Sequence, residues 1–504
     1  MDKVDKVDKV DKVASNPATR QGGTAMRSRR DLLKTALGGS ALLLAAACGG
    51  GGGGGQTAAA PTAAPAPAAK PTTGAAAQPT TAAAAAPTSA GASKTTAPAN
   101  LQGATVSVLQ WNHFIPTADP FFRQQIEDWG KQNGVNASLE TINGNDLVPR
   151  FTAAIQGQSG PTVFQMQYLA PHAFAEGLLD VTDLAKEIEP KFGTYYSQVN
   201  TSATVDGKYR SIPYNIAGNA FVYRKSYFDK AGAKKPETWD DFHDAVKKLA
   251  AIGKPIGQTF AQTFGDAPTF FYPLLWSYGG KEVEQDGKTV AINSKETVEA
   301  VKFAKACWDD GLEHKALGWD DSGNNTAFLA DEISATLNGA SIFFVAAGLD
   351  GKTPPKPWGA DDMDHFLTPK GPAGQFAWFL DFTQGIPSYV KGKDLDATKE
   401  LLRYLYDPKQ FDAWFELQKG YSMGPGNRLE QSPMWDALPK AMAPYRTAGK
   451  IARALGYAGQ PTPKTNEVFA KYIIVNMFSR AVQGTSPEDS VKQAEAEMKE
   501  IYGS

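Results

Sequence analysis

The sequence predicts an α/β fold with mostly parallel strand pairing, because strand and helix signals alternate along residues 101–504. Residues 104–111 form a β-branched, alternating run, and the apolar residues after it recur at helical spacing up to Gly134. A second short strand is expected at 162–168, and another strongly β-prone run surrounds residues 220–223. The 404 residues of this part are enough for two or three ordinary domains.

Helix boundaries in the middle of the chain follow from capping residues and turns. Thr238 is expected to cap a helix, with the Asp241 side chain reaching back to it, and Gly253 to end that helix. Residues 281–292 alternate in polarity and are interrupted by Asp286-Gly287, a pair typical of tight hairpin turns.

Three further helices are expected later in the chain. Ser294 is placed to cap the first, and the second, which contains Leu401, ends before Asp407-Pro408. The last helix opens at Ser486 with Pro487 in its first turn, where a missing N–H costs nothing.

An export signal is predicted at residues 26–48. Arg29 and Arg30 precede a run of 13 uncharged residues, 35–47, which Cys48 follows. This order is typical of a twin-arginine signal with a lipoprotein cleavage site. The apolar stretch is shorter than the roughly 20 residues that a membrane span needs, so we expect it to be cleaved and Cys48 to be acylated. The alternative is a cytoplasmic protein in which the arginines, the apolar segment, the cysteine and the spacer occur in this order by chance.

Residues 1–25 and 49–100 are expected to stay outside the fold. The first segment contains four Asp-Lys-Val repeats and is a charged extension or a misassigned start. The second consists almost only of Gly, Ala, Pro, Thr and Ser, so it cannot bury enough apolar area to fold. It is predicted to be a disordered tether with a mean span on the order of 40 Å.

Charge and cysteine content exclude some classes of protein. Residues 101–504 carry 40 Lys and Arg against 48 Asp and Glu, a net charge of about −8, whereas a nucleic-acid partner needs a concentrated positive surface. No nucleic-acid partner is therefore expected. Cys307 is the only cysteine besides Cys48, so no internal disulfide is expected, and its apolar, helical setting predicts a buried structural thiol.

The sequence contains no phosphate-binding Gly-rich loop, no paired-cysteine metal motif and no His-Glu-x-x-His helix, and its five histidines lie far apart. No metal, cofactor or catalytic residue is therefore expected. Asp240-Asp241, Asp309-Asp310 and Asp320-Asp321 could supply the two carboxylates of a glycoside hydrolase, but a helix start or a solvated turn explains each pair.

Aromatic residues beside amides or carboxylates are the strongest candidates for ligand contact. A sugar offers apolar ring faces and many hydroxyls, so its site needs flat aromatic platforms with amide or carboxylate partners. Core packing is the commoner role of any single aromatic side chain, and the pattern as a whole carries the prediction. Its members are Trp111, Asn112, Gln165, Gln167, Tyr168, Tyr214, Trp319, Trp378 and Asp381.

Several ordered segments resemble those of the solute-binding lipoproteins of ABC sugar importers, the family that includes the maltose-binding protein. They are residues 175–184, 212–242 with Ile212-Pro213-Tyr214 and Pro236-Glu237-Thr238-Trp239, Gly279-Gly280 before Asp286-Gly287, Asn338-Gly339, and residues 367–372. The resemblance covers nearly all of residues 101–504.

This resemblance implies a periplasmic-binding-protein type II-like fold, with two α/β lobes joined by crossing strands and a ligand cleft between the lobes. One lobe would contain residues 101–215 and 380–420, and the other residues 216–379 and 421–504. Crossings are expected near residues 214–219, 376–383 and 420–424.

The resemblance also adds Tyr272, Trp276 and Asn338 to the expected ligand-binding residues. It implies a monomer, lipid-anchored to the outer face of the cytoplasmic membrane, that captures a mono- or oligosaccharide and delivers it to separate permease subunits, without being an enzyme. Three alternatives remain open at this point: a binding protein for a non-sugar solute, a secreted polysaccharide-active enzyme, and a sensory partner of a membrane receptor.

Overall fold

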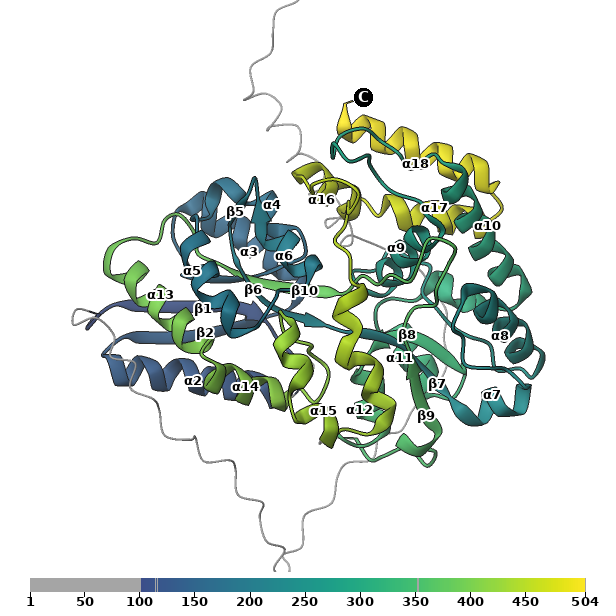
Figure 1. The fold of residues 1–504 in the computed structure, drawn as a ribbon, viewed down its shortest axis with the longest axis horizontal. Helices are drawn as coiled ribbons and strands as arrows, with labels where there is room; N and C mark the ends of the chain where they lie inside the picture. The colour runs from purple at the N-terminus through teal and green to yellow at the C-terminus, as the bar shows by residue number, and fades with distance from the viewer. Residues whose placement is uncertain (1–100, 114, 116, 351–352, 504) are drawn as a thin grey trace, which may run out of the picture. The chain divides into compact units, whose positions relative to one another are not determined.

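The computed structural model describes residues 101–113, 115, 117–350 and 353–503 (Figure 1). The predicted extension, export signal, lipidation site and tether, with Arg29, Arg30 and Cys48, lie outside the described residues. Within the described part, no helix combines the length and apolar character that crossing a bilayer requires.

The first sheet has five strands in the order β2-β1-β3-β10-β6. Strand β1 pairs in parallel with β2 and β3, and β10 runs antiparallel to β3 and β6. The strands are β1 (Thr105–Trp111), β2 (Asn136–Ile142), β3 (Val163–Gln167), β6 (Ile212–Ala217) and β10 (Leu380–Gly385).

Helices cover both faces of the first sheet (Figure 1). One face is covered by α2 (Ala118–Asn133), α13 (Gly392–Leu405) and α14 (Pro408–Leu417), and the other by α3 (Gly144–Gly157), α4 (Ala170–Ala173), α5 (Thr182–Ile188) and α6 (Ser197–Ala203). A two-stranded ribbon of β4 (Thr204–Val205) and β5 (Lys208–Tyr209) follows α6.

The second sheet has three antiparallel strands in the order β8-β7-β9. They are β7 (Asn219–Arg224), β8 (Ala335–Gly339) and β9 (Met363–Phe366). Side chains of β7 alternate between two apolar cores: Phe221 and Tyr223 pack on one face, and Ala220 and Val222 on the other.

Each core of the second sheet has its own helices. The core of Phe221 contains α7 (Lys225–Ala231), α8 (Trp239–Ala251), α9 (Asp266–Tyr278), α10 (Lys295–Asp310), α16 (Pro463–Ala470), α17 (Ile473–Val482) and α18 (Pro487–Tyr502). The core of Val222 contains α11 (Gly323–Leu329), α12 (Ser341–Ala346), α15 (Met434–Ala437) and the 3₁₀ helix η6 (Lys440–Ile451).

The chain passes directly from one sheet to the other at Gly218. This residue separates β6 of the first sheet from β7 of the second, and its N–H donates to the carbonyl of Tyr421. A Cβ here would lie 3.0 Å from Tyr445 and 3.3 Å from the sulfur of Met423, so the close packing of the crossing segments favours glycine. The Met423 N–H in turn donates to the carbonyl of Ile216.

The expectation of mostly parallel strands is wrong. Among the pairs of named strands, only β1 with its two neighbours is parallel and the others are antiparallel, although isolated parallel bridges such as Ile256 with Ala335 also occur. The reason is that β6 leaves the first sheet and β10 returns to it after the chain has built the second sheet, so β10 runs opposite to β6 and β3. The mixed α/β composition itself is confirmed.

The local start and stop signals are confirmed. Thr238 and Asp241 form the reciprocal capping box of α8, and Ser294 and Ser486 accept backbone N–H groups at the starts of α10 and α18. The Asp286-Gly287 turn brings Val283 and Val290 into a single antiparallel bridge. Cys307 is buried, as expected.

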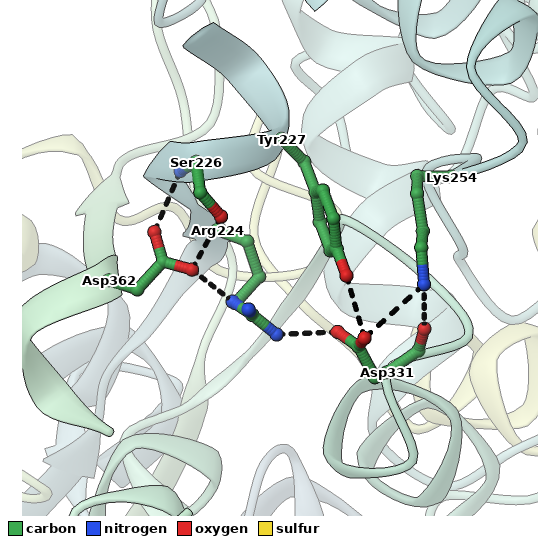
Figure 2. A network of polar contacts seen from close by, with 6 residues as sticks. All are labelled: Arg224, Ser226, Tyr227, Lys254, Asp331 and Asp362. Carbon is green, nitrogen blue, oxygen red and sulfur yellow. Dashed lines mark hydrogen bonds and ion pairs between the residues drawn. The ribbon is translucent and has the colours of Figure 1, made fainter. Parts of the chain in front are cut away.

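A network of charges fixes the end of β7 that lies opposite Asn219. The guanidinium of Arg224 reaches Asp331 at 2.5 Å and Asp362 at 2.6 Å, with the Arg224 side chain only 6% exposed (Figure 2). It also lies 3.9 Å from the ring centre of Trp358. Arg224 therefore ties β7 to the turn at Asp331 and to the 3₁₀ helix η4 (Ala360–Asp362), both more than 100 residues further along the chain.

Candidate ligand-binding site

A cavity of about 240 Å³ lies between the two sheets. The first sheet contributes the ends of β1, β6 and β10, and the second contributes the ends of β7 and β8 with the start of α9. Its walls are Trp111, Asn143, Gly144, Ala217, Asn219, Phe264, Gly265, Asp266, Asp321, Asn325, Asn338, Gly339, Ser341, Leu380 and Tyr421. Ligands of α/β proteins bind in such places, beyond the ends of strands.

Trp111 gives the cavity a flat aromatic wall. It is the last residue of β1, and its backbone N–H donates to Oε1 of Gln165 at 3.0 Å. The indole stacks on Phe382, with ring centres 5.5 Å apart and an angle of 16° between the planes. Gly144 approaches its edge so closely that a Cβ would lie 3.4 Å from the ring. The tryptophan is therefore held rigidly, with 8% of its surface exposed.

The second sheet supplies amide groups to the cavity. Asn219 and Asn338 come from neighbouring strands, because Asn219 pairs with Gly339 in the antiparallel register of β7 and β8. The Asn338 amide donates to Oδ1 of Asn325, whose own amide donates to Ser341 at 3.4 Å. Side-chain amides both donate and accept hydrogen bonds, so this side of the cavity can bind hydroxyl groups.

Asp321 fixes the loop that leads into α9. Its Oδ2 accepts the N–H of Phe264 at 2.9 Å, and its Oδ1 accepts the N–H groups of Gly265 and Asp266 at 3.0 and 2.8 Å. A carboxylate at this place satisfies backbone donors that have no partner within the helix and interacts favourably with the helix dipole.

Asp266, the first residue of α9, is a second carboxyl group in the cavity wall. It is 9% exposed, and its Oδ2 has no hydrogen-bond partner among the described residues. Burial, and then the charge of Asp321, raise the pKa of Asp266 well above its ordinary value.

The structure brings two of the predicted residues, Trp111 and Asn338, into the cavity wall. Others lie directly behind that wall. Gln165 holds the backbone of Trp111, and the amide nitrogen of Gln167 lies against Gly144. Tyr168 packs between Phe264 and Trp378, with ring centres 5.0 and 4.9 Å away.

The remaining predicted residues do not line this cavity. Asn112 is exposed, Tyr214 packs among Phe122, Phe411 and Trp414, Tyr272 and Trp276 are buried in α9, and the half-buried Trp319 packs on Gly257 and Gly323. Asp381 is buried in β10, where Gln198 donates to it at 2.9 Å. Burial raises the pKa of Asp381 to about 6.

Several residues of the cavity wall were not predicted from the sequence. Asn219 and Tyr421 lie in segments that the sequence predicts to cross between the lobes, and this position is the sequence signal that could have identified them. Asp321 was interpreted only as part of a solvated acidic pair, although its partners Phe264, Gly265 and Asp266 lie more than 50 residues earlier. Nothing local in the sequence indicates that contact.

The walls suit a polar solute with an apolar face. Aromatic faces come from Trp111, Phe264 and Tyr421, and hydrogen-bonding groups come from four asparagines, Ser341 and two aspartates. Among the described residues, no three His, Cys, Asp or Glu side chains are grouped so that they could hold a metal ion.

The profile of one protein family matches most of this chain. The family described as bacterial extracellular solute-binding protein matches residues 124–443. A binding protein of Brucella abortus (strain 2308) is 25% identical over 203 residues, which are 38% of this chain and 47% of the relative. An ABC transporter extracellular-binding protein of Pyrococcus horikoshii is 27% identical over 172 residues, 32% of this chain and 39% of the relative. The chain thus spans about half the length, or less, of these curated relatives.

Solved structures share the fold over a larger part of the chain. Maltose-bound MalE3 of T. maritima superposes with a TM-score of 0.63 at 19% identity, covering 79% of this chain and 100% of the other. A solute-binding protein from Agrobacterium radiobacter K84 in complex with ribitol gives a TM-score of 0.64 at 17% identity, covering 80% and 99%. The predicted α/β fold of the type II periplasmic-binding-protein class is therefore confirmed.

Proposed function

The chain belongs to the family of bacterial extracellular solute-binding proteins, and we therefore propose that it captures a mono- or oligosaccharide and delivers it to the permease of an ABC importer. One observation carries this proposal: the cavity is lined by the aromatic residue Trp111 from the first sheet and by the amide residues Asn219 and Asn338 from the second. A sugar ring requires an apolar platform together with hydrogen-bonding partners for its hydroxyls.

The comparisons support the solute class and the partner. The structural neighbours that share the fold were solved with maltose and with ribitol, and the Pyrococcus relative is named as part of an ABC transporter. We take the site residues to be Trp111 and Asn338, together with Asn219, Asp321 and Tyr421, which the sequence did not predict. We assign a supporting role behind the cavity wall to Gln165, Gln167, Tyr168 and Trp378.

Ligand capture requires the two sheets to move relative to each other. In this proposal residues 101–215 and 380–420 form one lobe, residues 216–379 and 421–504 form the other, and the segments around Gly218 act as the hinge. A permease can recognise the liganded shape only if the sugar binds the closed state more tightly than the open state. The protein acts as a binding monomer without catalysis.

Intrinsic tryptophan fluorescence tests the sugar proposal, because Trp111 lies in the cavity wall. We expect a saturable change with at least one mono- or oligosaccharide and no breakdown of that sugar on long incubation. A response to amino acids, polyamines or metal ions without any response to sugars would contradict the carbohydrate assignment. Turnover of an oligosaccharide would instead support a polysaccharide-active enzyme.

The N-terminal segment supports an extracytoplasmic, membrane-anchored location. Arg29 and Arg30 would direct export, acylated Cys48 would hold the protein at the membrane, and residues 49–100 would let the folded part reach both solute and permease. Mass spectrometry of the mature N-terminus tests this directly. Lipid on Cys48, lost together with membrane retention in Cys48→Ser, is expected, and an unmodified Cys48 in the membrane fraction would contradict it.

A further inference from the structure

The ionisable side chains in the cavity walls are all acidic. Asp266 and Asp321 line the cavity, whereas no lysine, arginine or histidine occurs among the described residues of its walls. Charged side chains placed in a wall determine which ligands a cavity accepts, and a like charge there costs several kcal/mol in binding a wrong partner. A site for an anionic solute would be expected to contain basic side chains, and the described walls of this cavity contain none.

Asp321 occupies the place that an anionic ligand would take. The start of a helix with free N–H groups is a ready anion site, since its backbone donors and its dipole both favour negative charge. At the start of α9 these donors are those of Phe264, Gly265 and Asp266, and all three point at the Asp321 carboxylate. The chain itself supplies the anion there.

Asp266 provides an independent indication of the ligand. Its residue surface is 91% buried, it belongs to the cavity wall, and its Oδ2 lacks a partner among the described residues. A buried carboxyl oxygen without a partner is costly, and the group that would satisfy it is a hydrogen-bond donor such as a hydroxyl or an ammonium, not an anion. An incoming carboxylate or phosphate would instead meet the Asp321 charge beside it.

We infer that Asp321 is a specificity-determining residue, which fills the anion site at the start of α9 with its own carboxylate and so restricts the cavity to uncharged or positively charged solutes. Among carbohydrates, neutral sugars and amino sugars are admitted, and uronic acids and sugar phosphates are rejected. The inference rests on the proposed function only in taking this cavity as the solute site.

Inorganic sulfate is a suitable probe, because removal of the Asp321 carboxylate should free its three backbone donors. Thermal unfolding of the full chain would be followed over millimolar sodium sulfate at constant ionic strength. The variants are Asp321→Ala and Asp321→Ser, and Asp320→Ala is the matched control, since the Asp320 carboxylate accepts from Ser322 and is not among the cavity walls. The control accounts for the general stabilisation that sulfate gives to any folded protein.

We expect sulfate to raise the unfolding midpoint of the two Asp321 variants saturably, by on the order of 2 °C more than that of the wild type or Asp320→Ala. Equal responses of all four proteins would overturn the inference. If an Asp321 variant fails to fold without sulfate, recovery of its folding by sulfate supports the inference and failure to recover contradicts it.

The sugar titration separates this inference from the proposed function. A sulfate response confined to the Asp321 variants, with no sugar bound by the wild type, would leave the inference standing and remove the carbohydrate assignment. Sugar binding by the wild type without a selective sulfate response would overturn the inference and leave the carbohydrate assignment standing.

Discussion

Trp111 is the side chain on which the proposed sugar contact depends most. Its indole is held from behind by Phe382 and through its backbone by Gln165, so a ligand can stack on it without ordering a mobile group. Preorganised aromatic walls contribute to affinity because little conformational entropy is lost on binding.

Replacing Trp111 by leucine or alanine is expected to raise the dissociation constant of the bound sugar about tenfold, or ~1.4 kcal/mol, by removing the flat stacking face. Asn112→Ala is the matched control, because Asn112 is the next residue but is exposed and outside the cavity. Isothermal titration calorimetry measures the constants, and circular dichroism checks the fold. An unchanged constant in both Trp111 variants would make Trp111 a packing residue only.

Asp381 predicts a pH dependence of stability. Burial raises its pKa from the ordinary 3.8 to about 6, while hydrogen bonds from Ser202 and Gln198 lower it in part. The folded state therefore binds the proton more tightly than the unfolded state. This contribution to stability is fully present below about pH 4 and is lost as the pH rises to about 6, with a total on the order of 3 kcal/mol.

Asp381→Asn has no such titration and keeps an acceptor for Gln198. Relative to the wild type, its free energy of unfolding should therefore be higher at neutral pH than at about pH 4, by up to the same ~3 kcal/mol. Urea denaturation at the two pH values measures the difference. A difference that does not change with pH would show that Asp381 does not titrate in this range.

At the scale of elements, Arg224 connects β7 to the turn at Asp331 and to η4, which ends at Asp362 (Figure 2). Removing this buried cation takes one ion pair away from each carboxylate, whereas Asp362 keeps its hydrogen bonds from Ser226 and Asp331 keeps those from Tyr227 and Lys254. Arg224→Met is therefore expected to lower the free energy of unfolding by about 3 kcal/mol.

Arg403→Met is the control for this prediction, because Arg403 also pairs with two carboxylates, Glu187 and Glu400, but is itself 32% exposed. An ion pair open to solvent contributes at most about 1 kcal/mol. Urea denaturation of both variants gives the comparison. Equal losses in the two proteins would show that burial does not strengthen the Arg224 network.

The elements that sequence reasoning predicted well are those with local causes. Thr238 and Asp241 are three residues apart and form their capping box within one turn, and Ser486-Pro487 starts α18 in the same way. Strand β2 (Asn136–Ile142) was missed, because only one residue of this edge strand is buried and the strand lacks a continuous apolar pattern. Strand direction was mispredicted, since it depends on where the chain re-enters a sheet.

The binding site could be predicted less well than the helix starts, because most of its contacts join residues that lie far apart in the sequence. Trp111 could be identified because it ends a clear strand. Asn219 and Asn338 meet only through the register of β7 and β8, and Asp321 meets the start of α9 across a long loop closure. A single sequence carries no local signal of such contacts.

At the scale of the whole molecule, the central claim is that a sugar binds between the two sheets and that they close on it. A crystal structure of the full chain grown with saturating amounts of its best-bound sugar tests this most directly. We predict a sugar ring against the Trp111 indole, with hydroxyls within hydrogen-bond distance of Asn219 and Asn338. Sugar bound elsewhere, or a cavity left unfilled at saturation, would contradict the account.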